Sequence, residues 1–148
     1  MRTPEGGFTT TLHGIGFDKA RQRTIDALKT EGFGVVSEID VTKTLKEKLG
    51  VDFRRYTILG ACNPAAAHHA LSTDLFVGLQ LPCNVCVFEE HPGKADGCAT
   101  VAIAKASAMF EGMKNPELMG LAAEIDARLA RVVQRLGTPC PEHAAANA

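Results

Sequence analysis

The feature that most constrains the fold is a long amphipathic helix predicted near the end of the chain. Asn115 is a favourable N-cap residue, and Pro116 suits the first helical position because its missing N–H needs no partner there. Gly137 and Pro139 then end the helix. In between, apolar residues recur at helical spacing, at Leu118, Leu121, Ala122, Ile125, Leu129, Val132 and Leu136. A helix with such a continuous apolar face has to pack against another layer of structure.

That other layer is predicted to be a β-sheet. Strands are expected at 8–14, 33–40, 54–62, 83–90 and 98–105, from β-type composition bounded by turn residues. Residues 83–105 should form a hairpin around the turn HPGKADG. Shorter helices are expected at 17–31, at 42–49 with Thr42 as cap and Gly50 as stop, at 64–72 and at 106–113. Strands mixed with helices of unequal length indicate an α+β fold, with helices packed on a mainly antiparallel sheet.

Length and composition indicate one soluble domain. The chain has 148 residues, of which 45% are hydrophobic and 22% are charged. We expect a flexible lead at 1–7, a single α+β domain at 8–137 and a disordered tail at 138–148. A net charge of −1 provides no electrostatic attraction to nucleic acid or to a membrane surface. No apolar run approaches the roughly 18 residues of a membrane span, and the N-terminus has no signal-peptide core. We therefore expect a cytoplasmic protein with no nucleic-acid or membrane partner.

The segment GACNPAAAHHAL, residues 60–71, combines a cysteine with a helix start. Cys62 ends a predicted strand, Asn63 is an N-cap and Pro64 takes the first helical position. A helix N-terminus favours a thiolate, but it stabilises an exposed charge by only about 0.3–1 kcal/mol. Cys62 would need a second contributor, such as a cation, a hydrogen bond or a metal, to become a strong nucleophile. The alternative is that Cys62 fills a tight strand-to-helix corner.

The second cysteine segment is CNVC, residues 83–86, which resembles a zinc or redox motif only superficially. The chain has no second CxxC to complete a zinc site, and the motif runs into a strand rather than a helix. In an extended strand Cys83 and Cys86 lie on opposite faces, so they should not share a metal. Glu89 lies on the same strand face as Cys83, and we expect it to act as a proton acceptor there.

The histidines are weaker candidates for a functional site than the cysteines. His68 and His69 are adjacent, so they diverge by about 100° on a helix and cannot form an i, i+4 metal pair. His69 should point to solvent, and His68 should lie at the edge of the buried face. Cys98 is expected to pack at the start of a strand, and the sequence identifies no partner for His13. The chain also has no GxGxxG, P-loop, GxSxG or HExxH motif.

The motifs ILGACNP and LPCNV, with EIDV and LKEKLGVDF before them, resemble the domain-of-unknown-function 302 family over residues 8–136. This resemblance implies a compact α+β fold and a homodimer. It implies no established activity, although some members occur in sulfur-metabolising bacteria. The characteristic cysteines of the family correspond to Cys62 and Cys83, with Asn63, Pro64 and Asn84 beside them.

Spacing and resemblance therefore lead to one hypothesis, in which Cys62 and Cys83 lie together at the mouth of a pocket. Such a pair could bind a small ligand or a soft metal ion such as Cu(I) or Zn. The expected supporting residues are Asn63, Pro64, Asn84, Glu89 and His68. The alternatives are a thiol-dependent enzyme or carrier in sulfur metabolism, and a structural or regulatory homodimer in which the cysteines only pack. No residue is assigned a catalytic role, and the one cofactor that the sequence suggests is a soft metal ion.

Overall fold

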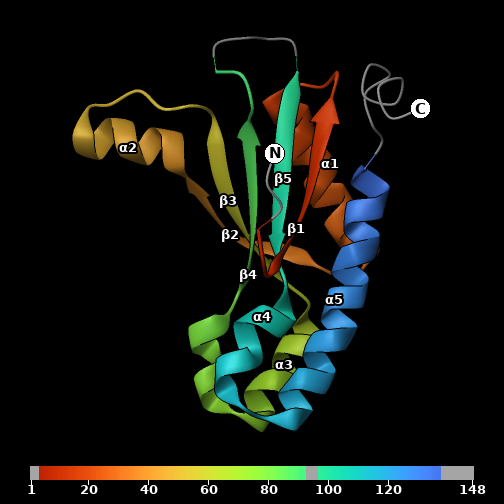
Figure 1. The fold of residues 1–148 in the computed structure, drawn as a ribbon. Coiled ribbons are helices and arrows are strands. Elements are labelled where there is room, and N and C mark those ends of the chain that lie inside the picture. The colour runs from red at the N-terminus through yellow and green to blue at the C-terminus, as the bar shows by residue number, and fades with distance from the viewer. Residues whose placement is uncertain (1–3, 93–96, 138–148) are drawn as a thin grey trace.

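Five antiparallel strands form the sheet at the centre of the fold, in a computed structural model that describes residues 4–92 and 97–137 (Figure 1). Their order across the sheet is β1-β5-β4-β3-β2, and each strand is antiparallel to its neighbours. The strands are β1 (Gly7–His13), β2 (Gly34–Asp40), β3 (Tyr56–Cys62), β4 (Cys83–Glu89) and β5 (Cys98–Ala104). The predicted hairpin is formed by β4 and β5, and the α+β class is confirmed.

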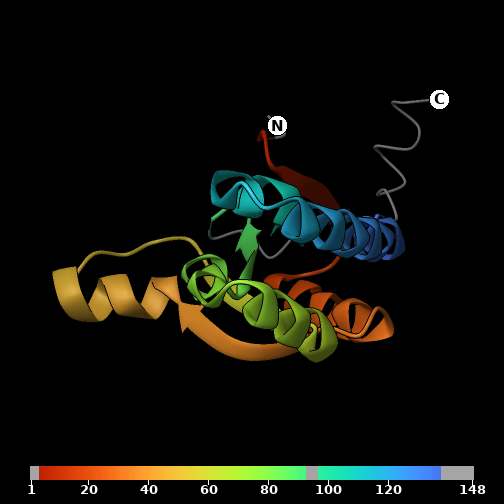
Figure 2. The ribbon, with the colours of Figure 1, turned by 90° about the horizontal axis from the view of Figure 1, so that it is seen from below.

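The helices lie on one face of this sheet and at one end of it. α1 (Phe17–Thr30) and α5 (Pro116–Leu136) pack side by side across one face. α3 (Pro64–Thr73), α4 (Ala106–Phe110) and the 3₁₀ segments η1 (Leu75–Gln80) and η2 (Glu111–Met113) gather below the sheet in Figure 1. α2 (Val41–Leu49) stands off to one side, which Figure 2 shows from below. None of the helices in the described ranges is long and apolar enough to cross a membrane.

The core lies between the sheet and the pair α1 and α5. Alternate residues of the central strands are buried against these helices: Leu59, Val85, Val87, Ala99, Val101 and Ile103. On α5 every apolar position predicted from the sequence is buried, and the Asn115 Oδ1 atom accepts hydrogen bonds from the N–H groups of Glu117 and Leu118. The long amphipathic helix is therefore confirmed, including its cap and its end before Gly137.

Some predicted boundaries differ from the structure. Asp40, rather than Thr42, caps α2, and its carboxylate accepts a hydrogen bond from the Lys43 N–H. The Thr42 hydroxyl instead donates to the Arg54 carbonyl and accepts from the Tyr56 N–H, so it ties α2 to the start of β3. β1 begins at Gly7, inside the predicted lead, and η1 was not predicted. The tail predicted at 138–148 lies outside the described residues.

Candidate functional site

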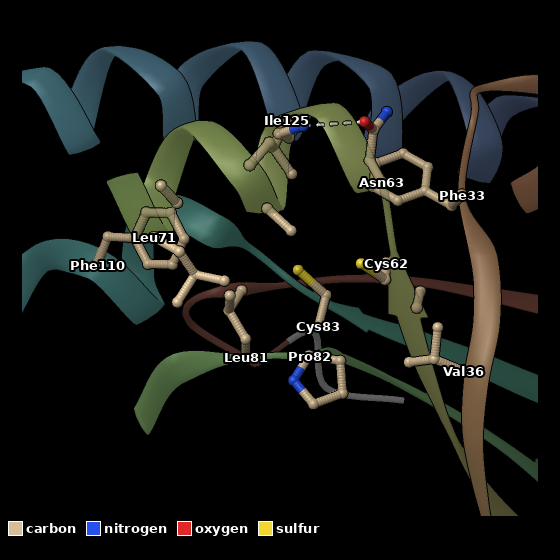
Figure 3. A pocket seen from close by; sticks show the side chains of 14 residues that line it. Phe33, Val36, Cys62, Asn63, Leu71, Leu81, Pro82, Cys83, Phe110 and Ile125 are labelled. Carbon is tan, nitrogen blue, oxygen red and sulfur yellow. Dashed lines mark hydrogen bonds between the residues drawn. The ribbon is translucent and has the colours of Figure 1, made fainter. Parts of the chain in front are cut away.

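A largely apolar pocket of about 270 Å³ lies at the end of the sheet, under α3 (Figure 3). Its walls come from α3, the end of β3, the start of β4 with the two residues before it, the start of β2 with the residue before it, and single residues of α4 and α5. The lining residues are Phe33, Val36, Ala61, Cys62, Asn63, Ala66, Ala67, Ala70, Leu71, Leu81, Pro82, Cys83, Phe110 and Ile125. The sequence signal that could have identified this wall is the alanine-rich start of α3, whose small side chains leave space against the sheet.

The structure brings the two predicted cysteines together in this pocket. Ala61 of β3 is directly opposite Cys83 of β4, and Cys62 is the next residue along β3. Cross-strand partners have Cα atoms up to about 5.5 Å apart and consecutive Cα atoms are about 3.8 Å apart, so the Cys62 and Cys83 Cα atoms are separated by at most about 9 Å. Figure 3 shows both side chains pointing into the pocket. Both thiols are reduced.

Cys83 is held as a neutral thiol. Its side chain is buried, and this burial raises the pKa of Cys83 to about 11, with further contributions from the negative charges of Asp126 and Cys62. Asp126 of α5 is fixed in place, because its carboxylate accepts hydrogen bonds from the N–H groups of Ala106 and Ser107 at the start of α4. At neutral pH Cys83 is therefore protonated and a poor nucleophile. Asp126 is a residue of this site that sequence reasoning missed.

Cys62 occupies the predicted strand-to-helix corner. The Asn63 Oδ1 atom accepts a hydrogen bond of 3.1 Å from the Ala66 N–H, and Pro64 begins α3, so the predicted helix start is confirmed. The 14 residues that line the pocket include no lysine, arginine or histidine. The lining thus provides no cation to assist the helix N-terminus in stabilising a Cys62 thiolate.

Three of the expected supporting residues lie away from the pocket. His68 is exposed on α3 and does not line the pocket, and Asn84 is exposed on the other face of β4. Glu89 shares a strand face with Cys83, as predicted, but it lies six residues further along β4, or about 20 Å. Its carboxylate accepts a hydrogen bond from the Arg55 N–H. Glu89 therefore cannot accept the Cys83 proton, because same-face alternation does not imply proximity along a strand.

The backbone of the ILGACNP motif is closely packed beside the pocket. A Cβ atom on Gly60 would lie 2.7 Å from the Cγ atom of Pro82 and closer still to the Ser37 hydroxyl, so only glycine fits there. Pro82, which lines the pocket, follows Leu81 through a cis peptide bond. Gly60 is a second residue that sequence reasoning missed, and it allows β2, β3 and the Pro82 segment to approach one another.

Cys86 lies on the opposite sheet face from Cys83, beside Tyr56, whose pKa is raised to about 12 by partial burial and then by the hydrogen bond and charge of Cys86. Cys83 and Cys86 are thus not partners, as predicted.

Across residues 4–92 and 97–137, no three His, Cys, Asp or Glu side chains are grouped so that they could hold a metal ion.

These features define a small α+β protein with an apolar pocket, walled in part by two thiols, at one end of an antiparallel sheet. Residues 8–136 match the family described as Domain of unknown function DUF302, and the chain belongs to that family. A crystal structure of an uncharacterised conserved DUF302 protein from Bacillus stearothermophilus is similar, with 34% sequence identity and a TM-score of 0.78. The match covers 90% of this chain and 99% of that one. No curated protein matches the sequence.

Proposed function

We propose that this protein binds a small apolar molecule in the pocket under α3, with the thiols of Cys62 and Cys83 forming part of the wall. The observation that carries this proposal is the lining itself, in which alanine, leucine, phenylalanine, valine and isoleucine side chains surround the two sulfur atoms. Small-molecule sites are concave, mostly apolar and furnished with a few polar groups. The Asn63 side chain and the two thiols are such groups, and a thiol is a soft, polarizable contact for an apolar ligand.

The state of Cys83 favours this function over thiolate chemistry. A thiolate is required both for metal ligation and for nucleophilic attack. Because burial and the Asp126 carboxylate keep Cys83 protonated, either chemistry would first have to remove a proton against both effects. A neutral ligand incurs no such cost. A soft metal ion between Cys62 and Cys83 is the second candidate, favoured by their adjacent positions on neighbouring strands. A thiol-dependent enzyme or carrier in sulfur metabolism stays a prediction.

We expect 1-octanol to bind in the pocket and to raise the thermal unfolding midpoint, because a ligand that binds only the folded state stabilises it. Ala67→Phe places a ring in the space that α3 leaves open, and it should abolish the octanol-dependent shift. His68→Phe is the matched control, since it adds the same ring to the adjacent, exposed position of the same helix. Differential scanning calorimetry against octanol concentration, with alkylation of Cys62 as a second readout, measures both effects.

Octanol bound in the pocket should also slow the alkylation of Cys62, because the side chain lines the same space. Equal octanol shifts in Ala67→Phe and His68→Phe would show that the alcohol acts elsewhere, and the proposal would fail. It would also fail if octanol had no effect while Cu(I) formed a one-to-one complex that was lost in both Cys62→Ser and Cys83→Ser. That second result would assign the pocket to a soft metal ion.

We also propose that the protein acts as a homodimer, as the family resemblance implies, through the surface formed by α2 and the segment after it. α2 has no buried residue and stands away from the rest of the fold (Figures 1 and 2). Leu49, Val51 and Phe53, at its end and just beyond, are 69%, 44% and 45% exposed. Apolar side chains concentrated on one projecting element are typical of surfaces that another chain covers.

Multi-angle light scattering should therefore give a mass of twice the 15.7 kDa of the chain. Phe53→Asp should shift the mass to that of the monomer, because a charge buried in an apolar interface is strongly unfavourable. Lys19→Asp, which places the same carboxylate at an exposed position of α1, should leave the dimer intact. A monomeric wild-type protein at 100 µM, the concentration for the measurement, would refute the dimer; a dimeric Phe53→Asp variant would refute the surface.

A further inference from the structure

A second hollow, of about 430 Å³, lies at the other end of the sheet from the thiol-lined pocket. Its walls come from β1, the start of β5 and the residues that follow β4. Cys98, Thr100 and Ala102 alternate along β5 with the residues buried under α1 and α5, so this hollow opens on the opposite face of the sheet. Its lining is polar, with threonine hydroxyls, two histidines, a carboxylate and one thiol.

The thiol in this hollow is paired with an imidazole. His13 and Cys98 are direct cross-strand partners in the pairing of β1 with β5. The Cys98 Sγ atom lies 3.4 Å from the His13 Nδ1 atom, within hydrogen-bonding distance for sulfur. With its proton on Nε2, the imidazole can accept the thiol proton at Nδ1. A base within hydrogen-bond reach of a thiol is the arrangement that activates cysteine nucleophiles.

The floor of the hollow carries a fixed negative charge. The Thr100 hydroxyl, which is fully buried, donates a hydrogen bond to the Glu90 carboxylate, and the Thr11 hydroxyl lies 3.0 Å from that of Thr100. Glu90 is held further by its backbone N–H, which donates to the Cys98 carbonyl. Glu90 and His91 are the other titratable side chains of the described chain that line this hollow. The Glu90 carboxylate lines the same hollow, where it favours a charged imidazole but disfavours a thiolate, so the activation of Cys98 rests on its contact with His13.

We propose that Cys98 and His13 form a reactive thiol–imidazole pair that exchanges with small hydrophilic disulfides. The Cys98 proton passes to the His13 Nδ1 atom, and the thiolate attacks one sulfur of the disulfide. The S–S bond of the reagent breaks as a new S–S bond forms to the Cys98 Sγ atom, and the departing thiolate takes the proton from His13. Cys98 ends as a mixed disulfide, the reagent has become one thiol, and no other oxidant is needed.

Two features of the hollow select this class of reagent. Its hydroxyl and charged lining suits a hydrophilic molecule, in contrast to the apolar lining around Cys62 and Cys83. Cys98 is also the one cysteine among the residues that line the hollow. Among the described residues, no second thiol lies in the hollow to resolve the mixed disulfide, which persists until a thiol from solution attacks it.

The test uses 2-hydroxyethyl disulfide on the whole protein at pH 7, with the adduct on each cysteine followed by peptide mass spectrometry. Cys98 should be modified first, the adduct should disappear with dithiothreitol, and Cys98→Ser should not form it. His13→Asn keeps an amide near the Nδ1 position but cannot take a proton at neutral pH, and it should slow the modification of Cys98 at least tenfold. His68→Asn, the same change at an exposed position on α3, should leave the rate unchanged.

Equal Cys98 rates in the wild type and in a folded His13→Asn variant would overturn the pair. If His13→Asn does not fold, as judged by circular dichroism, the pH profile of the wild type decides. An ordinary thiol with a pKa of about 8.5 reacts about eightfold faster at pH 8 than at pH 7, because its thiolate fraction rises by that factor. The proposed pair should show less than a threefold rise from pH 7 to pH 8. A rise of threefold or more over that interval would overturn it.

Discussion

Shortening Leu129 to alanine should lower the free energy of unfolding by about 2–5 kcal/mol, which is among the largest effects that any single change to this chain should have. Leu129 lies in the middle of α5 and is fully buried in the core cluster shared with α1 and the sheet. Two contributions make up this loss. The variant lacks the methyl groups whose transfer out of water favours folding, and their removal leaves a cavity in the core. The cavity collapses only in part, because the residues around Leu129 belong to the same packed core cluster.

Urea unfolding followed by circular dichroism measures this loss. Leu75→Ala is the matched control, because it removes the same atoms from a side chain that is 82% exposed. It should change the stability by no more than about 0.5 kcal/mol. If Leu129→Ala costs less than about 1 kcal/mol, then α5 is not seated on the sheet as described.

The type and order of the elements could be predicted because their signals are local. The α5 helix shows an N-cap, a first-turn proline, seven apolar positions at helical spacing and a terminal glycine, and all of them have these roles in the structure. The first residue of α2 was harder to predict. Asp40 and Thr42 are both good cap residues, and the choice between them depends on Thr42 being engaged by Arg54 and Tyr56 of a distant segment. Side-chain contacts of this kind leave no trace in local sequence.

The pocket was predictable in part. The position of Cys62 at a strand end and of Cys83 at a strand start allows both to lie at one end of the sheet. The two cysteines become neighbours because Ala61 pairs directly with Cys83. That pairing depends on the register of β3 against β4, which cannot be read from the sequence. Asp126, which lies 43 residues beyond Cys83 in the chain, could not have been linked to it without the packing of α5 and α4.

The contact between His13 and Cys98 was even harder to predict from the sequence. Each residue alone is unremarkable in sequence, and their separation of 85 positions gives no reason to connect them. They meet because the first strand of the chain pairs with the fifth, at the edge of the sheet, in a register that sets these two side chains opposite each other. Predicting this contact requires the strand order, which follows from the global packing of the helices rather than from any segment.

The stabilising contribution of Cys83 should be lost at alkaline pH, and the loss should be on the order of 2–3 kcal/mol. Its pKa is 9.0 in the unfolded chain and about 11 in the folded protein. Between these values the unfolded chain releases the proton while the folded protein keeps it, so the stability falls as the pH rises. The contribution is fully present below about pH 9 and is lost as the pH approaches 11, with about half of the loss reached by pH 10.

This change can be isolated by comparing the wild type with Cys83→Ala in urea unfolding at several pH values from 8 to 10.5. The stability advantage of the wild type should shrink across that range. Val85→Ala, the next residue on the same buried face of β4, removes volume but no titratable group, so its cost should not depend on pH. A wild-type advantage over Cys83→Ala that stays constant would mean that the folded protein does not resist ionisation of this thiol. Cys83 would then be available as a thiolate, and a soft metal ion would become the better candidate for the pocket.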